Sequence, residues 1–211
     1  MKKLFTLLAL IITFSMNAQM DDNSANNNSA GTNSVAMGNN TTASGNNSTA
    51  MGYFTTASGN KTTAMGANTT ASDYASLVIG QFNSSGSSVT NNATSFNTAN
   101  TAFVIGNGAD SSNKSDAFKV MFNGDTTVSN DLTVSGDVVI SSDARLKSNI
   151  VSLGSTLPKL LQIDGKSYEM KGKQKIGVLA QEIKEVFPRL VSEDDNEMLS
   201  VNYLGLVPVL I

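Results

Sequence analysis

The first half of the chain is built on a five-residue motif that returns every fourteen residues, and this repeat decides its fold. The motif Ser34-Val-Ala-Met-Gly38 recurs as Ser48-Thr-Ala-Met-Gly52, Thr62-Thr-Ala-Met-Gly66 and Ser76-Leu-Val-Ile-Gly80. A second motif lies between these copies, as Thr42-Ala-Ser-Gly45, Thr56-Ala-Ser-Gly59 and Thr70-Ala-Ser-Asp73. Each period therefore offers two strand-like segments of about five residues, separated by Gly and Asn turn residues.

Alternation along the first segment sorts its side chains onto two faces. Val35 and Met37 share one face, whereas Ser34, Ala36 and Gly38 share the other. When period is stacked on period, an apolar column forms from Met37, Met51, Met65 and Ile79, and a small-residue column forms from Ala36, Ala50, Ala64 and Val78. This pattern predicts a parallel β-solenoid in which each coil rises by about 4.8 Å.

One coil has too few apolar side chains to stabilise itself. About two apolar side chains per coil do not offset the conformational entropy lost on ordering fourteen residues. We therefore expect several chains to pack their apolar columns together. The alternative is a disordered linker rich in Asn, Thr, Ser and Gly, but such linkers do not keep a fourteen-residue register over four copies.

These repeats resemble the head repeats of trimeric autotransporter adhesins, the YadA-like heads, over about residues 31–80. The resemblance loosens over 81–110, where Thr101-Ala-Phe-Val-Ile-Gly106 is typical of a degenerate return of the motif after an insertion. It implies a trimeric left-handed β-roll, so we expect a homotrimer with a β-solenoid head over residues 19–110.

The N-terminus has the pattern of a secretory signal peptide. Lys2 and Lys3 precede an apolar run over 4–14, and small residues follow near Ala18. The run is too short to span a bilayer, so we expect cleavage after Ala18 and a secreted or cell-surface product. A retained membrane anchor is the alternative. No later stretch is long and apolar enough to predict a transmembrane segment in the mature chain.

Composition excludes several classes of function. The 211 residues include 17 acidic and 14 basic side chains, for a net charge of −3, which gives no reason to expect nucleic acid as a partner. The chain has no His and no Cys, so Ser-His and Cys-His catalysis, disulfides and thiolate zinc sites are excluded. We expect neither a cofactor nor a metal.

A short β connector is predicted over residues 111–141. Ala117-Phe-Lys-Val-Met-Phe122 and Thr126-Thr-Val128 flank an Asn-Gly pair, which is the pattern of a β-hairpin. Strand-like segments continue through Leu132-Thr-Val134 and Val138-Val-Ile140. We expect these segments to wrap a trimer axis below the head. A small independent β-domain is the alternative, although about thirty residues supply little core.

The remaining residues, 142–211, have the mixed signals of a small α+β domain. A short helix is predicted at Leu157-Pro-Lys-Leu-Leu161, with Ser155 or Thr156 as its cap. Strands are predicted at 166–170 and 199–203. An amphipathic helix is predicted within 177–187, with Pro188 ending it. The whole fold class is therefore mainly β, with a small α+β C-terminal domain.

This C-terminal part resembles the intramolecular chaperone domain of phage endosialidases and tail fibres, a family of self-cleaving serine peptidases. Four motifs carry the resemblance in order: 142–150 (SDARLKSNI), 176–183 (IGVLAQEI), 187–191 (FPRLV), and 201–203 (VNY) with Pro208. The resemblance implies a catalytic pair at Ser142 and Lys147 and a scissile bond between Ser141 and Ser142. Family members continue into a long trimerising helix, and we expect this sequence to stop short of it.

A catalytic pair of Ser142 and Lys147 requires a lysine that can act as a base and a bend that brings the two side chains together. A lysine can act as the base for a hydroxyl nucleophile when burial or a neighbouring cation lowers its pKa, and Arg145 is such a neighbour. Asp143 would oppose this effect, so we assign it an orienting or capping role. Positions five apart do not share a face of a helix or strand. The pair therefore requires a bend within 142–147, or a Lys147 supplied by a neighbouring subunit.

These features predict a secreted trimeric fibre whose C-terminal domain registers three chains and then cuts itself off. The main rival is a surface adhesin whose C-terminal domain is a permanent trimer clamp. An enzyme acting on an external substrate has no support in the sequence. A cell-surface or glycan receptor is the candidate partner of the head, and Tyr53 and Phe54 are a candidate contact, although one aromatic pair more often packs than binds.

Overall fold

The computed structural model describes residues 20–21, 26–84, 92–194 and 196–210. The segment predicted to be a signal peptide lies outside these residues. The chain divides into two compact units, Met1–Asp137 and Val138–Ile211.

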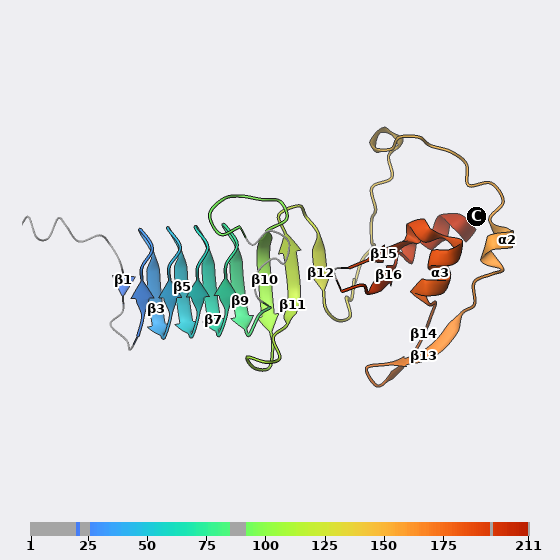
Figure 1. Ribbon diagram of the computed structural model, residues 1–211. Coiled ribbons are helices and arrows are strands. Elements are labelled where there is room, and N and C mark those ends of the chain that lie inside the picture. The colour runs from blue at the N-terminus through green and yellow to red at the C-terminus, as the bar shows by residue number, and fades with distance from the viewer. Residues whose placement is uncertain (1–19, 22–25, 85–91, 195, 211) are drawn as a thin grey trace, which may run out of the picture. The chain divides into compact units, whose positions relative to one another are not determined.

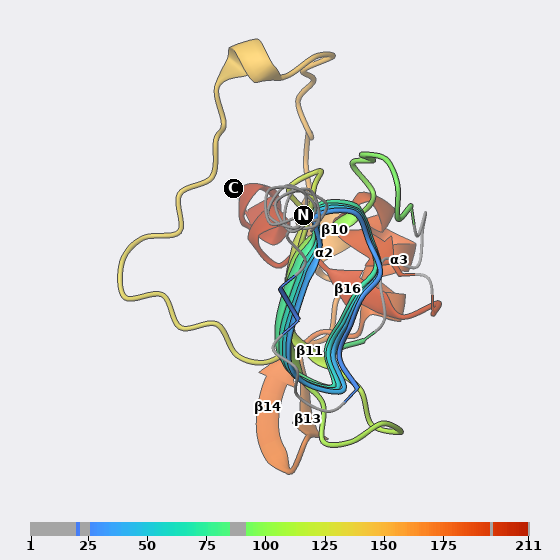
Figure 2. The same cartoon turned by 90° about the vertical axis from the view of Figure 1, so that its left-hand side faces the viewer.

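The first unit is a parallel β-solenoid, as the repeat predicts. Its long strands are β3 (Val35–Asn39), β5 (Thr49–Tyr53), β7 (Thr63–Ala67) and β9 (Leu77–Gln81), which pair in parallel with a shift of one period. The short strands β2 (Asn28–Ser29), β4 (Thr42–Ala43), β6 (Thr56–Ala57) and β8 (Thr70–Ala71) form a second, four-stranded sheet. Figure 1 shows the long strands side by side, and Figure 2, seen along the stack, shows the coils superposed. The short strand β1 (Met20–Asp21) pairs with β3.

The two predicted columns occupy opposite faces of the long strands. Ala36, Ala50 and Ala64 pair in register and have no exposed surface, so the small-residue column lies inside the coil. Met37, Met51, Met65 and Ile79 also pair in register, but each keeps some exposed surface. Over the regular repeats the coil interior holds Ala, Ser and Thr, and Val78 and Val104 are the largest side chains of the same apolar core cluster. The Met and Ile side chains of the other column lie on the outside of the single chain.

Tight turns make the coil narrow. Asn33, Asn47, Asn40 and Asn68 adopt left-handed backbone conformations at the corners, where Asn is better tolerated than most residues. Gly45 is needed for a different reason: a Cβ at this position would lie 1.9 Å from the carbonyl oxygen of Gly59 on the next coil. The prediction of two five-residue strands per period is wrong in its second half. The turns leave only two residues for each second strand.

After an insertion the repeat returns. Strand β10 (Thr101–Asn107) pairs in parallel with β9, with Val104 beside Val78 and Ile105 beside Ile79. This confirms the degenerate copy predicted there. Asp73 anchors the return, because its buried carboxylate accepts a hydrogen bond from the Thr101 backbone N–H at 2.8 Å.

The predicted hairpin is present and extends the head sheet. Strand β11 (Asp116–Met121) pairs antiparallel with both β10 and β12 (Thr126–Val128). The strands predicted at 132–134 and 138–140 are absent, so that prediction is wrong for the single chain. Residues 129–143 form no strand and are exposed, since no neighbouring edge is there to pair with them.

The second unit is a small α+β assembly. It contains α2 (Leu157–Leu160), a hairpin of β13 (Lys166–Met170) and β14 (Lys173–Gly177), and α3 (Ala180–Val186). The 3-10 turn η2 (Pro188–Leu190), the pair β15 (Val191–Glu193) and β16 (Leu199–Val201), and η3 (Leu204–Leu210) complete it. The predicted short helix and the predicted strand at 166–170 are present. The strand predicted at 199–203 ends at Val201, and α3 begins only at Ala180 because β14 extends to Gly177. Strands β14 and β15 were not predicted.

This unit has very little core. Among its described residues, Ile183 and Val209 are the fully buried apolar side chains. Contacts at the periphery support them: Lys166 forms ion pairs with Asp164 at 2.7 Å and Glu182 at 3.2 Å, and the Val178 backbone N–H donates to the Tyr203 hydroxyl. Thr156 does not cap α2 with its side chain. Its hydroxyl donates instead to the Val209 carbonyl at 2.7 Å, which ties α2 to η3.

Candidate functional site

A single 3-10 turn brings the two predicted catalytic side chains together. The turn η1 (Ala144–Leu146) begins after an extended Asp143 and ends at an extended Lys147, whose backbone N–H donates to the Ala144 carbonyl. The Lys147 Nζ lies 2.7 Å from the Ser142 Oγ and donates a hydrogen bond to it. The bend that the spacing requires therefore exists within one chain.

Asp143 holds this turn in shape. Its carboxylate accepts the Arg145 backbone N–H at 2.8 Å and binds the Arg145 guanidinium through Nε and Nη2, with the closest contact at 2.6 Å. The guanidinium, followed by the backbone hydrogen bond, lowers the pKa of Asp143. Arg145 is paired with Asp143 in this turn, and its predicted influence on Lys147 stays a prediction.

The predicted scissile bond lies in an open part of the chain. Ser141 and Ser142 have no regular structure and are exposed, as is every residue of 129–155, which we call the arm. In both Figure 1 and Figure 2 the arm around η1 runs away from the helices and strands of its own unit. A bond in such a segment is accessible to the Ser142 hydroxyl beside it.

The arm is also unusually apolar for an exposed segment. Its exposed large apolar side chains are Leu132, Val134, Val138, Val139, Ile140, Leu146, Ile150, Val151 and Leu153. Val139 retains 88% of its surface and Val151 retains 78%. Apolar side chains so densely placed indicate that the arm is covered in the assembled protein.

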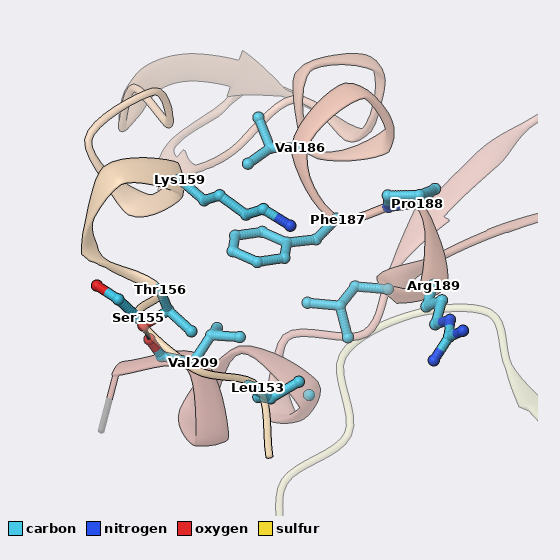
Figure 3. A pocket seen from close by; sticks show the side chains of 11 residues that line it. Leu153, Ser155, Thr156, Lys159, Val186, Phe187, Pro188, Arg189 and Val209 are labelled. Atoms are coloured by element: carbon cyan, nitrogen blue, oxygen red, sulfur yellow. Dashed lines mark hydrogen bonds between the residues drawn. The ribbon is translucent and has the colours of Figure 1, made fainter. Parts of the chain in front are cut away.

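A groove that sequence reasoning did not predict lies in the same unit, and Leu153 and Ser155 at the end of the arm contribute to its lining. It has a volume of about 450 Å³ and lies between α2, the end of α3 with η2, and η3. Its lining includes Lys159, Phe187, Arg189, Leu190 and Val209. Figure 3 shows Lys159 extending over the ring of Phe187, and the Nζ lies 5.7 Å from the ring centroid. The groove is formed by segments about fifty residues apart in the sequence. No local sequence pattern predicts that these segments contact each other.

Two further absences hold for the described part of the chain. No group of three or more Asp and Glu side chains gathers there in a way that could hold a metal ion. None of the helices in the described ranges is long and apolar enough to cross a membrane.

Comparison with known families finds one match in each unit. Residues 29–55 and 57–83 match two copies of the YadA head domain repeat, and residues 142–192 match the chaperone of endosialidase. No curated protein matches the chain. Both matches confirm the predicted resemblances and their order. The chain thus carries, in this order, segments similar to the YadA head domain repeat and to the chaperone of endosialidase.

Proposed function

We propose that the chain is exported and assembles as a homotrimeric, adhesin-like fibre whose C-terminal unit acts as an intramolecular chaperone and then cuts the backbone between Ser141 and Ser142. Ser142 is the nucleophile and Lys147 is the base. The observation that carries the proposal is the 2.7 Å contact between the Lys147 Nζ and the Ser142 Oγ, made at the first residue of the matched chaperone domain.

The chemistry proceeds through an ester at the cut site. Neutral Lys147 takes the proton of the Ser142 hydroxyl while the Oγ attacks the carbonyl carbon of Ser141. The C–N bond breaks, the Ser142 nitrogen takes up the proton, and the acyl group is now held by the Oγ. Water then hydrolyses this ester. The products are a chain ending in the Ser141 carboxylate and a fragment that begins with the free amine of Ser142.

Assembly supplies the condition under which Lys147 can act as a base. In the single chain Ser142 and Lys147 are exposed to water, whereas a lysine becomes an effective base where water is excluded. Leu146, Ile150 and Val151 flank the pair, and packing these side chains against other copies would remove water from it. The cut is thereby coupled to correct assembly, and it leaves three registered chains that cannot easily separate and re-register.

The outside column of the head supports a trimer. Met37, Met51 and Met65 lie in register on the outer face of the coil while the interior is filled by alanines. Contact between three such columns would bury the apolar surface that one chain leaves open.

A receptor-binding role of the head has one specific observation in its favour. Tyr53 and Phe54 are both exposed and lie edge to face, with ring centroids 4.6 Å apart. Phe54 has a left-handed backbone (φ 52°) at a corner where the neighbouring coils place Asn40 and Asn68. A bulky residue is disfavoured there, yet the same corner two coils later holds Phe82 (φ 41°), so what sets Phe54 apart is its exposed aromatic neighbour Tyr53. The pair is our candidate contact with a cell-surface or glycan receptor.

Binding of the head to cells should fall in Phe54→Asn while the trimer persists. Loss of the trimer instead would mark the pair as a subunit contact.

Denaturing mass spectrometry tests the self-cleavage. The wild-type chain should split into fragments ending at Ser141 and beginning at Ser142, whereas Ser142→Ala and Lys147→Gln should stay whole. Ser152→Ala, in the same arm, and Lys173→Gln, on β14, are matched controls that should be cut like the wild type. If wild type and variants all stay whole while running as trimers, the C-terminal domain is a permanent clamp and the proposed cut is overturned.

A further inference from the structure

We infer that the groove between α2, η2 and η3 is a product site, which binds the carboxyl end created at Ser141 together with the apolar residues Val138–Ile140 that precede it. The inference rests on the proposed cut between Ser141 and Ser142. It assigns a role to a feature that the cleavage chemistry does not use.

The groove has the size and lining of a peptide site. Its volume of about 450 Å³ lies within the range of small-ligand pockets. Leu153, Val186, Phe187, Leu190 and Val209 make most of its wall apolar. Four extended residues span about 13 Å, so a short segment with branched aliphatic side chains is a suitable occupant.

The charges of the groove call for an anion. Its lining contains two cations, Lys159 and Arg189, and no acidic residue. Arg145, Lys166 and Lys184 of this unit form ion pairs with carboxylates, whereas the ion pairs found among the described residues do not include Lys159 or Arg189. Lys159 is held over the Phe187 ring, whereas Arg189 lies beyond this ring, near Pro188, with its guanidinium turned away from Lys159, so it would have to swing inward to meet the same anion (Figure 3). A carboxylate between apolar walls would form charge-assisted hydrogen bonds with these groups.

The segment that ends at the cut has both properties that the groove requires, namely apolar side chains and a negative charge. Val138, Val139 and Ile140 are exposed in the arm and have no apolar partner that buries them. Before the cut, the peptide bond after Ser141 carries no charge. After the cut, Ser141 ends in a carboxylate directly behind three aliphatic side chains. The groove therefore distinguishes product from precursor by a charge that only the cut creates, as in other sites that capture C-terminal carboxylates.

Such a site would keep the chaperone on the fibre after the covalent link is lost. The released unit, which begins at Ser142, would stay bound through the new end of its own or a neighbouring chain. Because two cations hold the end, raised ionic strength should weaken the attachment.

The test uses the uncut Ser142→Ala protein and a synthetic peptide of residues 136–141, Gly-Asp-Val-Val-Ile-Ser. Calorimetry should show the free-acid peptide binding at least tenfold more tightly than the same peptide with an amidated end. The double variant Lys159→Gln, Arg189→Gln in the Ser142→Ala background should lose this preference. Lys173→Gln in that background is the control and should keep it. Circular dichroism checks that each variant is folded.

Equal binding of acid and amide, no binding of either, or an unchanged preference in the double variant would overturn the product site. Because the Ser142→Ala protein does not depend on cleavage, these results are separate from the test of the cut itself. If the wild-type chain is never cut, no carboxylate forms at Ser141. The groove would then not be a product site, even if it binds the free-acid peptide.

Discussion

The carboxylate of Asp143 binds both the backbone and the side chain of Arg145, and this double contact closes the turn that brings Lys147 to Ser142. The backbone N–H contact is 2.8 Å long and the guanidinium contact is 2.6 Å long. Asp143 itself has no contact with the reacting bond. It is therefore a positioning residue, which acts through the shape of the chain between the two catalytic side chains.

Asp143→Ala should slow the cut without abolishing it. The variant loses the cap of the 3-10 turn and the pairing of Arg145, so the turn is closed for a smaller fraction of the time. We expect cleavage about threefold to tenfold slower, as for the loss of other capping side chains. Asp143→Asn keeps an oxygen that can accept the Arg145 N–H, so its cleavage rate should lie between those of the wild type and Asp143→Ala.

A time course by mass spectrometry measures the rate, and the amide chemical shift of Arg145 reports on the turn. A catalytic role would instead make Asp143→Asn as slow as Asp143→Ala while the Arg145 amide signal stays in place.

Gly45→Ala should strongly destabilise the head. The new Cβ would lie 1.9 Å from the Gly59 carbonyl oxygen, a backbone atom that cannot move without opening the ladder between coils. A loss of about 3 kcal/mol or more in the free energy of unfolding is expected, in the range of severe core strain. Gly136→Ala is the control, because nothing lies within 4 Å of its added Cβ. Thermal unfolding of both variants should show a large decrease only for Gly45→Ala. An equal, small decrease in both would mean that the coils are not packed as described.

Asp116→Asn should stabilise the head at neutral pH. Burial raises the pKa of Asp116, although its carboxylate accepts the Ser84 backbone N–H at 2.8 Å. A carboxyl whose pKa is raised by folding adds stability below its unfolded pKa of about 3.9, and this stability is lost as the pH rises through the folded value. The variant should therefore melt about 2 °C higher than the wild type at pH 7, and the difference should disappear below about pH 3.9.

Asp110→Asn provides the opposite control. Hydrogen bonds from the Asn113 side chain and from the Ser112 and Asn113 backbone lower the pKa of Asp110. Its contribution is present above the unfolded pKa and is lost as the pH falls through the folded value. This variant should melt lower than the wild type at pH 7 and converge with it in acid. Parallel behaviour of the two variants would contradict the assigned environments.

Sequence periodicity predicted most of the head because each coil repeats its predecessor. Once Met37 and Met51 are fourteen residues apart in equivalent motifs, parallel stacking fixes their register. The hairpin of β11 and β12 followed from its Asn-Gly turn in the same way. The length of the second strand of each coil was overestimated. Some residues that alternate like a strand belong instead to the two tight corners on either side of it.

Contacts between distant segments could not be predicted from such patterns. The groove depends on α2 meeting η3, which the hydrogen bond from Thr156 to the Val209 carbonyl fixes across 53 residues. The strand expected over 138–140 depends on a neighbouring edge that one chain does not supply. The pairing of Arg145 with Asp143 was missed because the sequence shows three charges close together but not which two of them meet.

Met51→Glu should disrupt the trimer. Met51 lies on the outer face of β5, in register with Met37 and Met65, so a carboxylate there would be buried wherever the columns of three chains meet. Burying this polar group without a partner should cost about 2 kcal/mol or more per chain. Met51→Leu should keep the trimer, and Ser44→Glu, on an exposed corner of the coil, is the charge-matched control. Light scattering coupled to size-exclusion chromatography measures the mass of each variant in solution. Trimers that persist unchanged in Met51→Glu would show that the methionine column faces water, and the head would then have to assemble through another surface.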